Sequence, residues 1–444
     1  MDFTKGKITR QIVLFTLPLL LGNLCQQLYS VADAIIVGRY ISGGTLAAVG
    51  SSTAIIGFLN GSLLGLTIGA AVVISHCYGA SEQQRLRRTF TTSVIFLVIV
   101  SLCLSVLGFI LSPVLLRLLS TPVEIFDYAV RYLRLSIIGL VFQAIFNMYS
   151  SYMRALGDSK HPLYLLICAS LLNILLDYAF VAWFNLGVAG VALATIVSNV
   201  FAVLLSILLV RRQIPLLKVE VLVFDKESFP AILRNSLPAA IQMTGTSLIS
   251  LLITRLANSF GELAAAGYSA AIRLDSFALL LLESLSLTMA TFAGQNIGAG
   301  NVLRAKKGYR NILIMMLTIA LCASAFVLLF GKQILGIFVS QQDPNSGRIV
   351  SYGWEFLATI GMFYVLHALF FSFNGFFRGT GDATIVMILT ISSLSIRVIC
   401  SYLFAATIVS GPAAIGYSIP IGWAICGTIA YIYYRKGKYL KHSV

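Results

Sequence analysis

Residues 89–113 read TFTTSVIFLVIVSLCLSVLGFILSP and contain no charged side chain. A helix needs about 20 apolar residues to cross the hydrocarbon core of a bilayer, so this stretch predicts a transmembrane helix. The whole chain has the same character: 58% of its 444 residues are apolar, 11% are charged, and its mean hydropathy is +0.92. An average soluble domain has about 25% charged residues. The composition therefore excludes a water-soluble fold and favours an all-α integral membrane protein.

Eleven further stretches share the length and apolar composition of this one, which gives twelve predicted transmembrane helices. Strands of a β-barrel alternate apolar and polar residues, whereas these runs are unbroken. The second, eighth and tenth stretches exceed a simple crossing, so we expect them to tilt or to extend beyond the bilayer. The predicted spans cover residues 12–37, 46–75, 89–113, 128–152, 163–184, 188–210, 232–258, 264–295, 309–331, 350–376, 384–407 and 413–434.

The net charge of +15 is spread unevenly over the predicted loops. With a cytoplasmic N-terminus, most of the 31 Lys and Arg residues fall in cytoplasmic loops, in agreement with the positive-inside rule. We therefore predict a multi-pass protein of the bacterial plasma membrane (the cytoplasmic or inner membrane) with both termini in the cytoplasm. The positive charge is explained by topology, so we expect the lipid bilayer and no nucleic acid as a partner.

Two segments that lie 224 residues apart carry the same motif: Met148–Asp158 reads MYSSYMRALGD and Ser372–Asp382 reads SFNGFFRGTGD. Such self-similarity predicts an internal duplication. Each half contains six spans, so the repeat is parallel, with two six-helix bundles around a central cleft. The predicted domains are an N-terminal lobe over residues 1–210, a cytoplasmic linker over residues 211–231 and a C-terminal lobe over residues 232–444.

Polar side chains inside the spans are the functional candidates, because they are expensive to place in a membrane. Asp33 and Asp177 are deep carboxyl groups, and a carboxyl group in a low-dielectric site takes up a proton more readily than in water. Asn173 lies one helical turn before Asp177, on the same face. Pro18 allows the first span to bend. We predict cation coupling at the two acids, and a plain role as hydrogen-bonding glue between helices is the alternative.

The second lobe lacks a matching carboxylate, because the 224-residue offset places Arg397 opposite Asn173 and Ser401 opposite Asp177. Its deep charges are expected either to form interhelical ion pairs or to contact substrate. For His367, a satisfied buried histidine is the alternative to a role in the cleft. The candidate cleft residues of both lobes are Asn23, Gln26, Tyr29, Gln143, Asn147, Arg273, Asp275, Glu283, His367, Asn374 and Arg397.

A ladder of small residues runs along the second predicted span: Gly57, Gly61, Gly65 and Gly69. Small residues at this spacing allow helices to pack closely. A surface that slides during transport is the alternative interpretation.

The first lobe resembles the multidrug and toxic compound extrusion (MATE) family. Pro18 followed by Asp33 within YSVADAIIVG (residues 29–38) is similar to the bent first helix of that family and its carboxylate. NILLD (residues 173–177) is similar to the signature of the fifth helix, and Thr195 to the threonine of the sixth. The seventh span has no early acid, so the chain is more similar to the DinF-like and broader bacterial branch than to the NorM type.

The resemblance implies a secondary active multidrug antiporter that exports organic cations and amphiphilic drugs by alternating access. The implied coupling ion is the proton, or sodium, bound by Asp33, Asp177, Asn173 and Thr195. A lipid-linked oligosaccharide flippase of the same superfamily and an exporter of one specific metabolite are the alternatives. The chain has no HExxH, GxSxG or Walker motif, so we expect no enzyme activity, catalytic residue, metal site or cofactor. We also expect a monomer.

Overall fold

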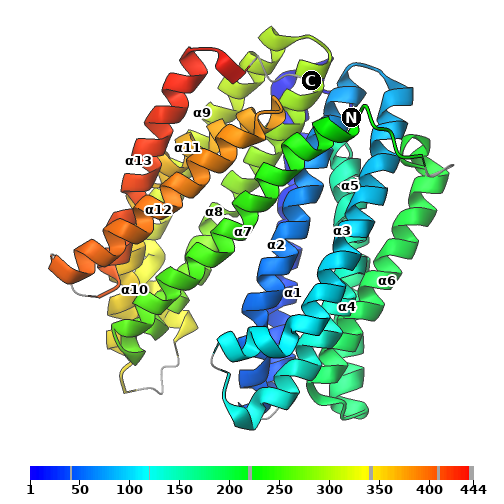
Figure 1. Cartoon of the computed structure of the whole chain (residues 1–444). Helices are drawn as coiled ribbons and strands as arrows, with labels where there is room; N and C mark the ends of the chain where they lie inside the picture. Colours follow the sequence, from blue (N-terminus) through cyan, green and yellow to red (C-terminus); the bar gives the residue numbers. More distant parts are fainter. Residues whose placement is uncertain (41–42, 120, 219–222, 340–343, 408–410, 440–444) are drawn as a thin grey trace. The chain divides into compact units, whose positions relative to one another are not determined.

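The computed structural model describes residues 1–40, 43–119, 121–218, 223–339, 344–407 and 411–439, with side chains except at residues 34, 37–49 and 51. Every element within these ranges is helical (Figure 1), as the composition predicts. The elements are α1 (Ile8–Tyr40), α2 (Gly43–Gly79), α3 (Gln83–Leu118), α4 (Val123–Ala155), α5 (Lys160–Tyr178), the π-helical turn η1 (Ala179–Trp183), α6 (Gly187–Gln213), the 3-10 turn η2 (Pro215–Leu217), α7 (Phe229–Ser259), α8 (Glu262–Gly298), α9 (Val302–Phe338), α10 (Ser346–Gly361), α11 (Tyr364–Gly379), α12 (Ala383–Thr407) and α13 (Ala413–Arg435).

Eleven of the described helices are long and apolar enough to cross a membrane, and the bent pair α10 and α11 adds a twelfth span. The twelve predicted spans are thereby confirmed. The second and eighth correspond to α2 and α8, each 37 residues long. At 1.5 Å per residue, both helices exceed the roughly 30 Å hydrocarbon core.

The tenth predicted span, residues 350–376, differs from the expected single long helix. It consists of α10 and α11, which meet at an angle of 57°. The break follows Gly361, a poor helix former, and the N–H of Phe363 bonds to the carbonyl oxygen of Ile360 (2.9 Å) instead of continuing the α-helical pattern. The apolar run continues through the break, so hydropathy does not reveal it.

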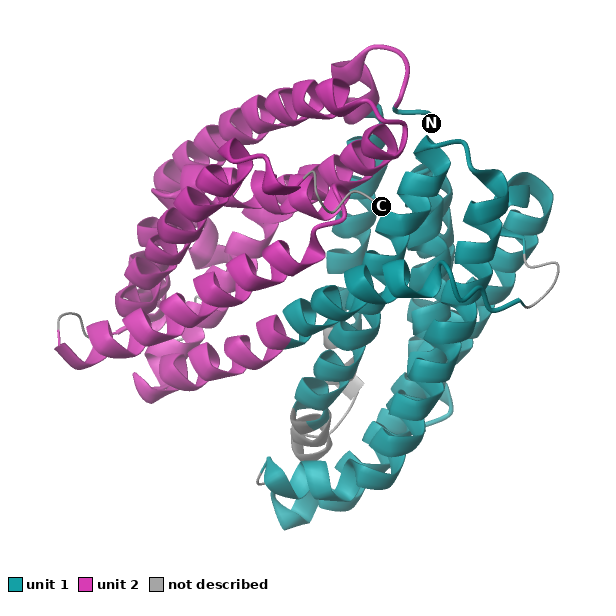
Figure 2. Ribbon diagram, turned by 45° about the horizontal axis from the view of Figure 1, so that its top comes forward, with its two compact units in different colours: residues 1–3, 14–244, 444 teal, residues 4–13, 245–443 magenta. Residues whose placement is uncertain are grey.

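The chain divides into two compact units (Figure 2). Unit 1 comprises residues 1–3 and 14–244, and unit 2 comprises residues 4–13 and the described residues from 245 onward. The boundary thus falls inside α7 and not in the predicted linker at residues 211–231. The division into lobes at residues 210 and 232, which was drawn from the sequence repeat, stays a prediction.

The duplication is visible in how helices pack within each unit. In unit 1, α4 packs against α2, α3 and α6, and α5 packs against α6. In unit 2, the pair α10 and α11 packs in the same way against α8, α9 and α13, and α12 packs against α13. The counterparts of α2, α3, α5 and α6 are therefore α8, α9, α12 and α13, and the broken pair α10 and α11 corresponds to α4.

The repeated motif forms the same turn in both units. Gly157 and Gly381 adopt φ angles of +81° and +86°, a left-handed conformation that glycine tolerates best. The following aspartates then accept hydrogen bonds from the next helix: Asp158 Oδ1 from the N–H of Lys160 (3.1 Å) and Asp382 Oδ1 from the N–H of Ile385 (3.3 Å). The shared R-x-x-G-D pattern therefore marks a turn before a helix and has a structural role.

The first half of α7 belongs to unit 1 because it packs closely on α2. A Cβ atom added to Gly65 would lie 2.5 Å from the carbonyl oxygen of Ala239, so only glycine fits there. Ser236 Oγ donates to the carbonyl oxygen of Leu66 (2.8 Å), and Ser62 and Thr244 share a hydrogen bond of 2.7 Å. The C-terminal part of the glycine ladder, at Gly65, is thus a packing surface. A Cβ atom on Gly57, at its N-terminal end, would meet nothing within 4 Å.

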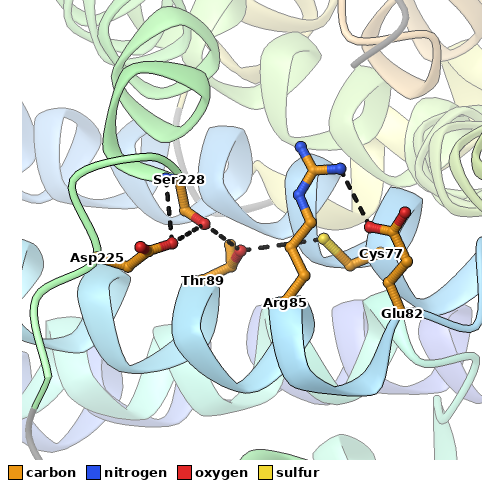
Figure 3. Close-up of polar contacts among 6 residues, drawn as sticks. All are labelled: Cys77, Glu82, Arg85, Thr89, Asp225 and Ser228. Carbon is orange, nitrogen blue, oxygen red and sulfur yellow. Dashed lines mark hydrogen bonds and ion pairs between the residues drawn. The ribbon is translucent and has the colours of Figure 1, made fainter.

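Polar contacts fix the segment before α7 onto α3 (Figure 3). The side chain of Asp225 accepts hydrogen bonds from the N–H (3.2 Å) and the hydroxyl (2.5 Å) of Ser228. Thr89 donates to Ser228 Oγ (3.2 Å), and the N–H of Asp225 donates to Thr92 Oγ1 (2.9 Å). The hydrogen bonds from Ser228 stabilise the charged carboxylate and lower the pKa of Asp225.

The segment before α1 has an analogous place in unit 2. The guanidinium of Arg304 donates to the carbonyl oxygens of Lys5 (3.0 Å) and Gly6 (2.8 Å), and Asn311 donates to Thr9 (3.1 Å). Both α1 and α7 therefore begin in one unit and continue in the other. Each carries an interior proline, Pro18 in α1 and Pro238 in α7.

Candidate functional site

A polar cluster in unit 1 is formed by α1, α5 and α6. Asp177, at the end of α5, is fully buried, and Asn173, one turn earlier, is 3% exposed. Asp33 lies half-buried on α1 and interacts electrostatically with Asp177. Two carboxyl groups from helices far apart in sequence thus share one site.

Asn173 joins α5 to α6. With its amide turned so that both polar atoms are satisfied, its nitrogen donates to Asp177 Oδ2 (2.6 Å) and its oxygen accepts from the backbone N–H of Thr195 (3.2 Å). The Thr195 hydroxyl donates to the carbonyl oxygen of Val191 (3.0 Å) in its own helix. Asn173 therefore links α5 to α6 within the cluster.

Tyr29 and Tyr132 complete the surroundings of the two acids. Both tyrosines interact electrostatically with Asp33 and Asp177. Tyr29 was among the residues predicted for the cleft. Tyr132 on α4 was missed, because a tyrosine near the end of an apolar stretch has the pattern of an interfacial belt residue.

Each of the two acids has one buried carboxylate oxygen without a hydrogen-bond partner among the described residues. These atoms are Asp33 Oδ1 and Asp177 Oδ1. Buried polar atoms are normally paired, so such atoms call for an explanation such as an unseen ion or a catalytic or binding role. The two free oxygens suit a site that accepts a proton or a small cation.

The backbone is irregular directly after Asp177. The α-helix α5 ends at Tyr178, and the π-helical turn η1 follows over Ala179–Trp183. Insertions of this kind in helices are frequent at functional sites. The sequence AFVAW contains neither proline nor glycine, so no local signal announces the turn.

The other predicted residues of unit 1 have varied environments. Asn23 is half-buried and Gln26 is exposed on α1, while Gln143 and Asn147 are half-buried on α4. Pro18 lies inside α1, which continues through it as a helix. Contact of these residues with substrate stays a prediction.

In unit 2, the deep charges of α8 and α12 form a second polar cluster with two tyrosines. Tyr364 donates to Asp275 Oδ1 (2.8 Å). Arg397 interacts electrostatically with Tyr268 and with Asp275. Sequence reasoning missed both tyrosines, because their partners come from other helices.

The remaining charges of unit 2 do not form the expected ion pairs. Arg273 and Glu283 are exposed. Among the described residues, neither these two nor Arg397 has an oppositely charged atom within 4.0 Å.

His367 and Asn374 are buried, and the His367 ring packs against Phe371 and Trp423, with centroid distances of 4.0 and 4.8 Å. The packing agrees with a core position for His367, although its Nδ1 has no partner in the described part of the chain. The described residues also contain no group of three His, Cys, Asp or Glu side chains that could hold a metal ion.

Comparisons with known proteins agree with this architecture. The family model MatE matches residues 18–179 and 238–403, one block in each half of the duplication. The probable multidrug resistance protein YpnP of Bacillus subtilis (strain 168) is 31% identical over 99% of this chain and 97% of its own length. The multidrug export protein MepA of Staphylococcus aureus (strain MW2) is 23% identical over 96% of this chain and 94% of its own.

Two solved structures show the same fold. A crystal structure of MATE in the bent conformation has a TM-score of 0.90 and 23% identity, and covers 99% of this chain and 98% of that one. A crystal structure of MATE in the straight conformation has a TM-score of 0.89 and 24% identity, and covers 98% of this chain and 97% of that one.

Proposed function

Because this chain belongs to the MatE family, whose members are transporters and not enzymes, we propose that it is a secondary active multidrug antiporter. It exports organic cations and amphiphilic drugs, and the inward flow of protons, or of sodium ions, drives the export. The observation that carries this proposal is the Asp33–Asp177 pair, with one buried oxygen on each acid that no described residue satisfies.

The pair supplies a chemical switch. Two carboxyl groups in one site titrate together, so the first proton is shared and strongly held. Uptake of a proton or a cation removes the repulsion between the acids and allows α1 to approach α5. Release restores the charges and the repulsion. Asn173 and Thr195 hold Asp177 in place, so Asp33 on α1 is the partner that moves.

The driving force is sufficient for export. At a membrane potential of about 150 mV, one charge that crosses the membrane supplies about 3.4 kcal/mol. This free energy corresponds to a concentration ratio of about 300-fold. A single coupling ion per cycle therefore suffices to keep an uncharged amphiphile at low concentration in the cytoplasm. The exchange of one ion for one monovalent organic cation moves no net charge, so the concentration gradient of the ion supplies its driving force.

Pro18 and the division of α1 support alternating access. Proline lacks the N–H that would bond to the carbonyl oxygen of Leu14, so α1 bends more easily there than a regular helix. The same region contains the point at which α1 passes from unit 2 to unit 1. We place both termini and the linker in the cytoplasm of a bacterial cell and the protein in its plasma membrane as a monomer.

The alternatives have weaker support. A flippase for a lipid-linked oligosaccharide would bind a pyrophosphate and would need several cations together. Arg273 is exposed, which leaves Arg397 as the deep base of the predicted pair. An exporter of one metabolite would share the coupling site, so it differs from the leading proposal in substrate range alone.

Efflux from vesicles tests the proposal. Purified protein is reconstituted, loaded with a fluorescent organic cation, and exposed first to a pH gradient and then to a sodium gradient. We expect dye transport against its own gradient under one of the two conditions. Transport that ignores both gradients would overturn antiport, and failure to move any of several unrelated dyes would favour the single-metabolite exporter.

A further inference from the structure

Arg397 is an unusual residue for its position. It lies in the interior of α12, a 25-residue helix that is a candidate membrane span. A guanidinium inside a membrane is costly and is kept only with partners or for a function.

The partners of Arg397 within unit 2 are incomplete. Tyr268 interacts electrostatically with the guanidinium. The Nε–H is buried and has no acceptor among the described residues. Asp275 is the nearby acid, yet it makes no ion pair with Arg397 within 4.0 Å, and its Oδ1 accepts from Tyr364 instead. A buried charged donor without an acceptor points to a missing anionic group.

The duplication gives this place in the fold a meaning. Arg397 occupies the position in α12 that Asn173 occupies in α5, and Ser401 stands where Asp177 stands. Ser401 is buried and shares a hydrogen bond of 2.6 Å with Ser418 on α13, just as Asn173 bonds to α6. The Asn173–Asp177 site of unit 1 therefore has a counterpart in unit 2, with a guanidinium in place of the amide and a hydroxyl in place of the acid.

We propose that Arg397, beside Tyr268, binds the oxyanion of an amphiphilic ligand, a carboxylate on a transported substrate. The planar guanidinium fork matches carboxylate and phosphate oxygens with two parallel hydrogen bonds, and Nε–H is one of the donors that such a fork uses. The inference rests on the proposed export of amphiphiles, and it extends the substrates from cations to compounds that also carry an acid. The phosphate of an anionic lipid offers the same chemistry, so the test separates the two sources.

A pair of dyes that differ at one group provides the test. Rhodamine 110 carries a free carboxylate, and rhodamine 123 is its methyl ester. Binding of each dye to protein in phosphatidylcholine nanodiscs is measured by fluorescence polarisation, without any ion gradient. We expect Arg397→Gln to weaken rhodamine 110 binding at least tenfold and to leave rhodamine 123 within about twofold. Arg397→Lys, which keeps the charge and loses the fork, should show an intermediate loss.

The matched control is Arg255→Gln, the same substitution at an exposed position of α7 in unit 2, which should change neither dye. Size-exclusion profiles and melting curves establish that each variant is folded. Unchanged binding of rhodamine 110 to Arg397→Gln and Arg397→Lys would overturn the proposal, and so would an equal loss for both dyes.

Phosphatidylglycerol in the nanodiscs identifies the source of the oxyanion. If phosphatidylglycerol leaves the binding of rhodamine 110 unchanged, the site binds the carboxylate of a substrate. If phosphatidylglycerol weakens the binding of rhodamine 110 to the wild type but not to Arg397→Gln, the site binds lipid phosphate, and the substrate proposal is wrong. The binding test uses no ion gradient. A negative result in it would therefore not contradict ion coupling through Asp33, and a negative result in the efflux test would not contradict the dye binding.

Discussion

The side-chain nitrogen of Asn173 lies 2.6 Å from Oδ2 of Asp177, the acid that follows it by one turn of α5. This hydrogen bond satisfies one carboxylate oxygen and holds the side chain in a single orientation. The other oxygen, Oδ1, is buried and has no described partner. Asp177 is thus fixed on one side and available on the other, which is the arrangement expected of a group that exchanges a cation.

Removal of the Asn173 amide should slow transport. Its N–H donates to one oxygen of Asp177 and holds the carboxyl group in one orientation. Because a hydrogen bond to a charged group contributes about 1.5–3 kcal/mol, the maximal efflux rate of Asn173→Ala should fall about tenfold or more. Dye efflux from vesicles measures the rate. Asn258→Ala, at the exposed end of α7, is the control, and an unchanged rate in Asn173→Ala would contradict the assigned role.

Restoration of a regular first helix should slow transport. Pro18→Ala supplies the missing N–H, and proline inside a helix is less favourable than alanine by about 3 kcal/mol. We expect a lower maximal efflux rate, unchanged dye affinity and a higher melting temperature, because the straight helix is stabilised. Stopped-flow efflux and equilibrium dye binding separate rate from affinity. The control is Pro113→Ala, the same substitution inside α3. If it slows efflux as much as Pro18→Ala does, Pro18 has no special role in transport.

Close packing of α7 on α2 predicts a contrast along the glycine ladder. In Gly65→Ala the new methyl group would lie 2.5 Å from the carbonyl oxygen of Ala239, so backbone must shift. Overpacking of this kind costs about 1–3 kcal/mol. Gly57→Ala adds the same group where nothing lies within 4 Å and should leave the melting temperature unchanged or slightly higher. Equal melting curves for the two variants would show that α7 does not hold this position.

The contacts before α7 predict a stability difference that depends on pH. The two hydrogen bonds from Ser228 lower the pKa of Asp225, so their stabilisation is present above the ordinary value of about 3.9 and is lost as the pH falls through the lower folded value. Ser228→Ala should melt earlier than wild type at pH 7, and the gap should narrow toward pH 3. Ser250→Ala, at an exposed site of α7, is the control. A gap that stays constant from pH 7 to pH 3 would exclude Asp225 as its cause.

The sequence predicts the number of spans because each apolar run is long enough to be read alone. It fails at the tenth span, where the run continues through the break between Gly361 and Tyr364. The passage of α1 and α7 from one unit to the other is likewise hidden, because it depends on contacts such as Arg304 with Lys5 that lie far apart in the chain.

Some features of the candidate site likewise follow from the sequence, and others do not. The adjacency of Asn173 and Asp177 follows from helical spacing, and the structure brings them together as predicted. The approach of Asp33 and Tyr132 to that pair depends on the packing of α1 and α4, which no local pattern encodes. Arg397 was expected either to pair with an acid or to contact substrate. No acidic atom among the described residues lies within 4.0 Å of it, because tertiary packing sets which side chains of different helices meet.

Gradient-driven transport by Asp33→Asn tests the central claim most directly. The variant keeps the size and polarity of the side chain and removes its titratable group. Asp127→Asn, at an exposed position of α4, is the matched control. In vesicles with an imposed pH gradient and then an imposed sodium gradient, we predict wild-type dye accumulation for Asp127→Asn and none for Asp33→Asn under either gradient, with equal amounts of folded protein. Wild-type accumulation by Asp33→Asn would contradict the account.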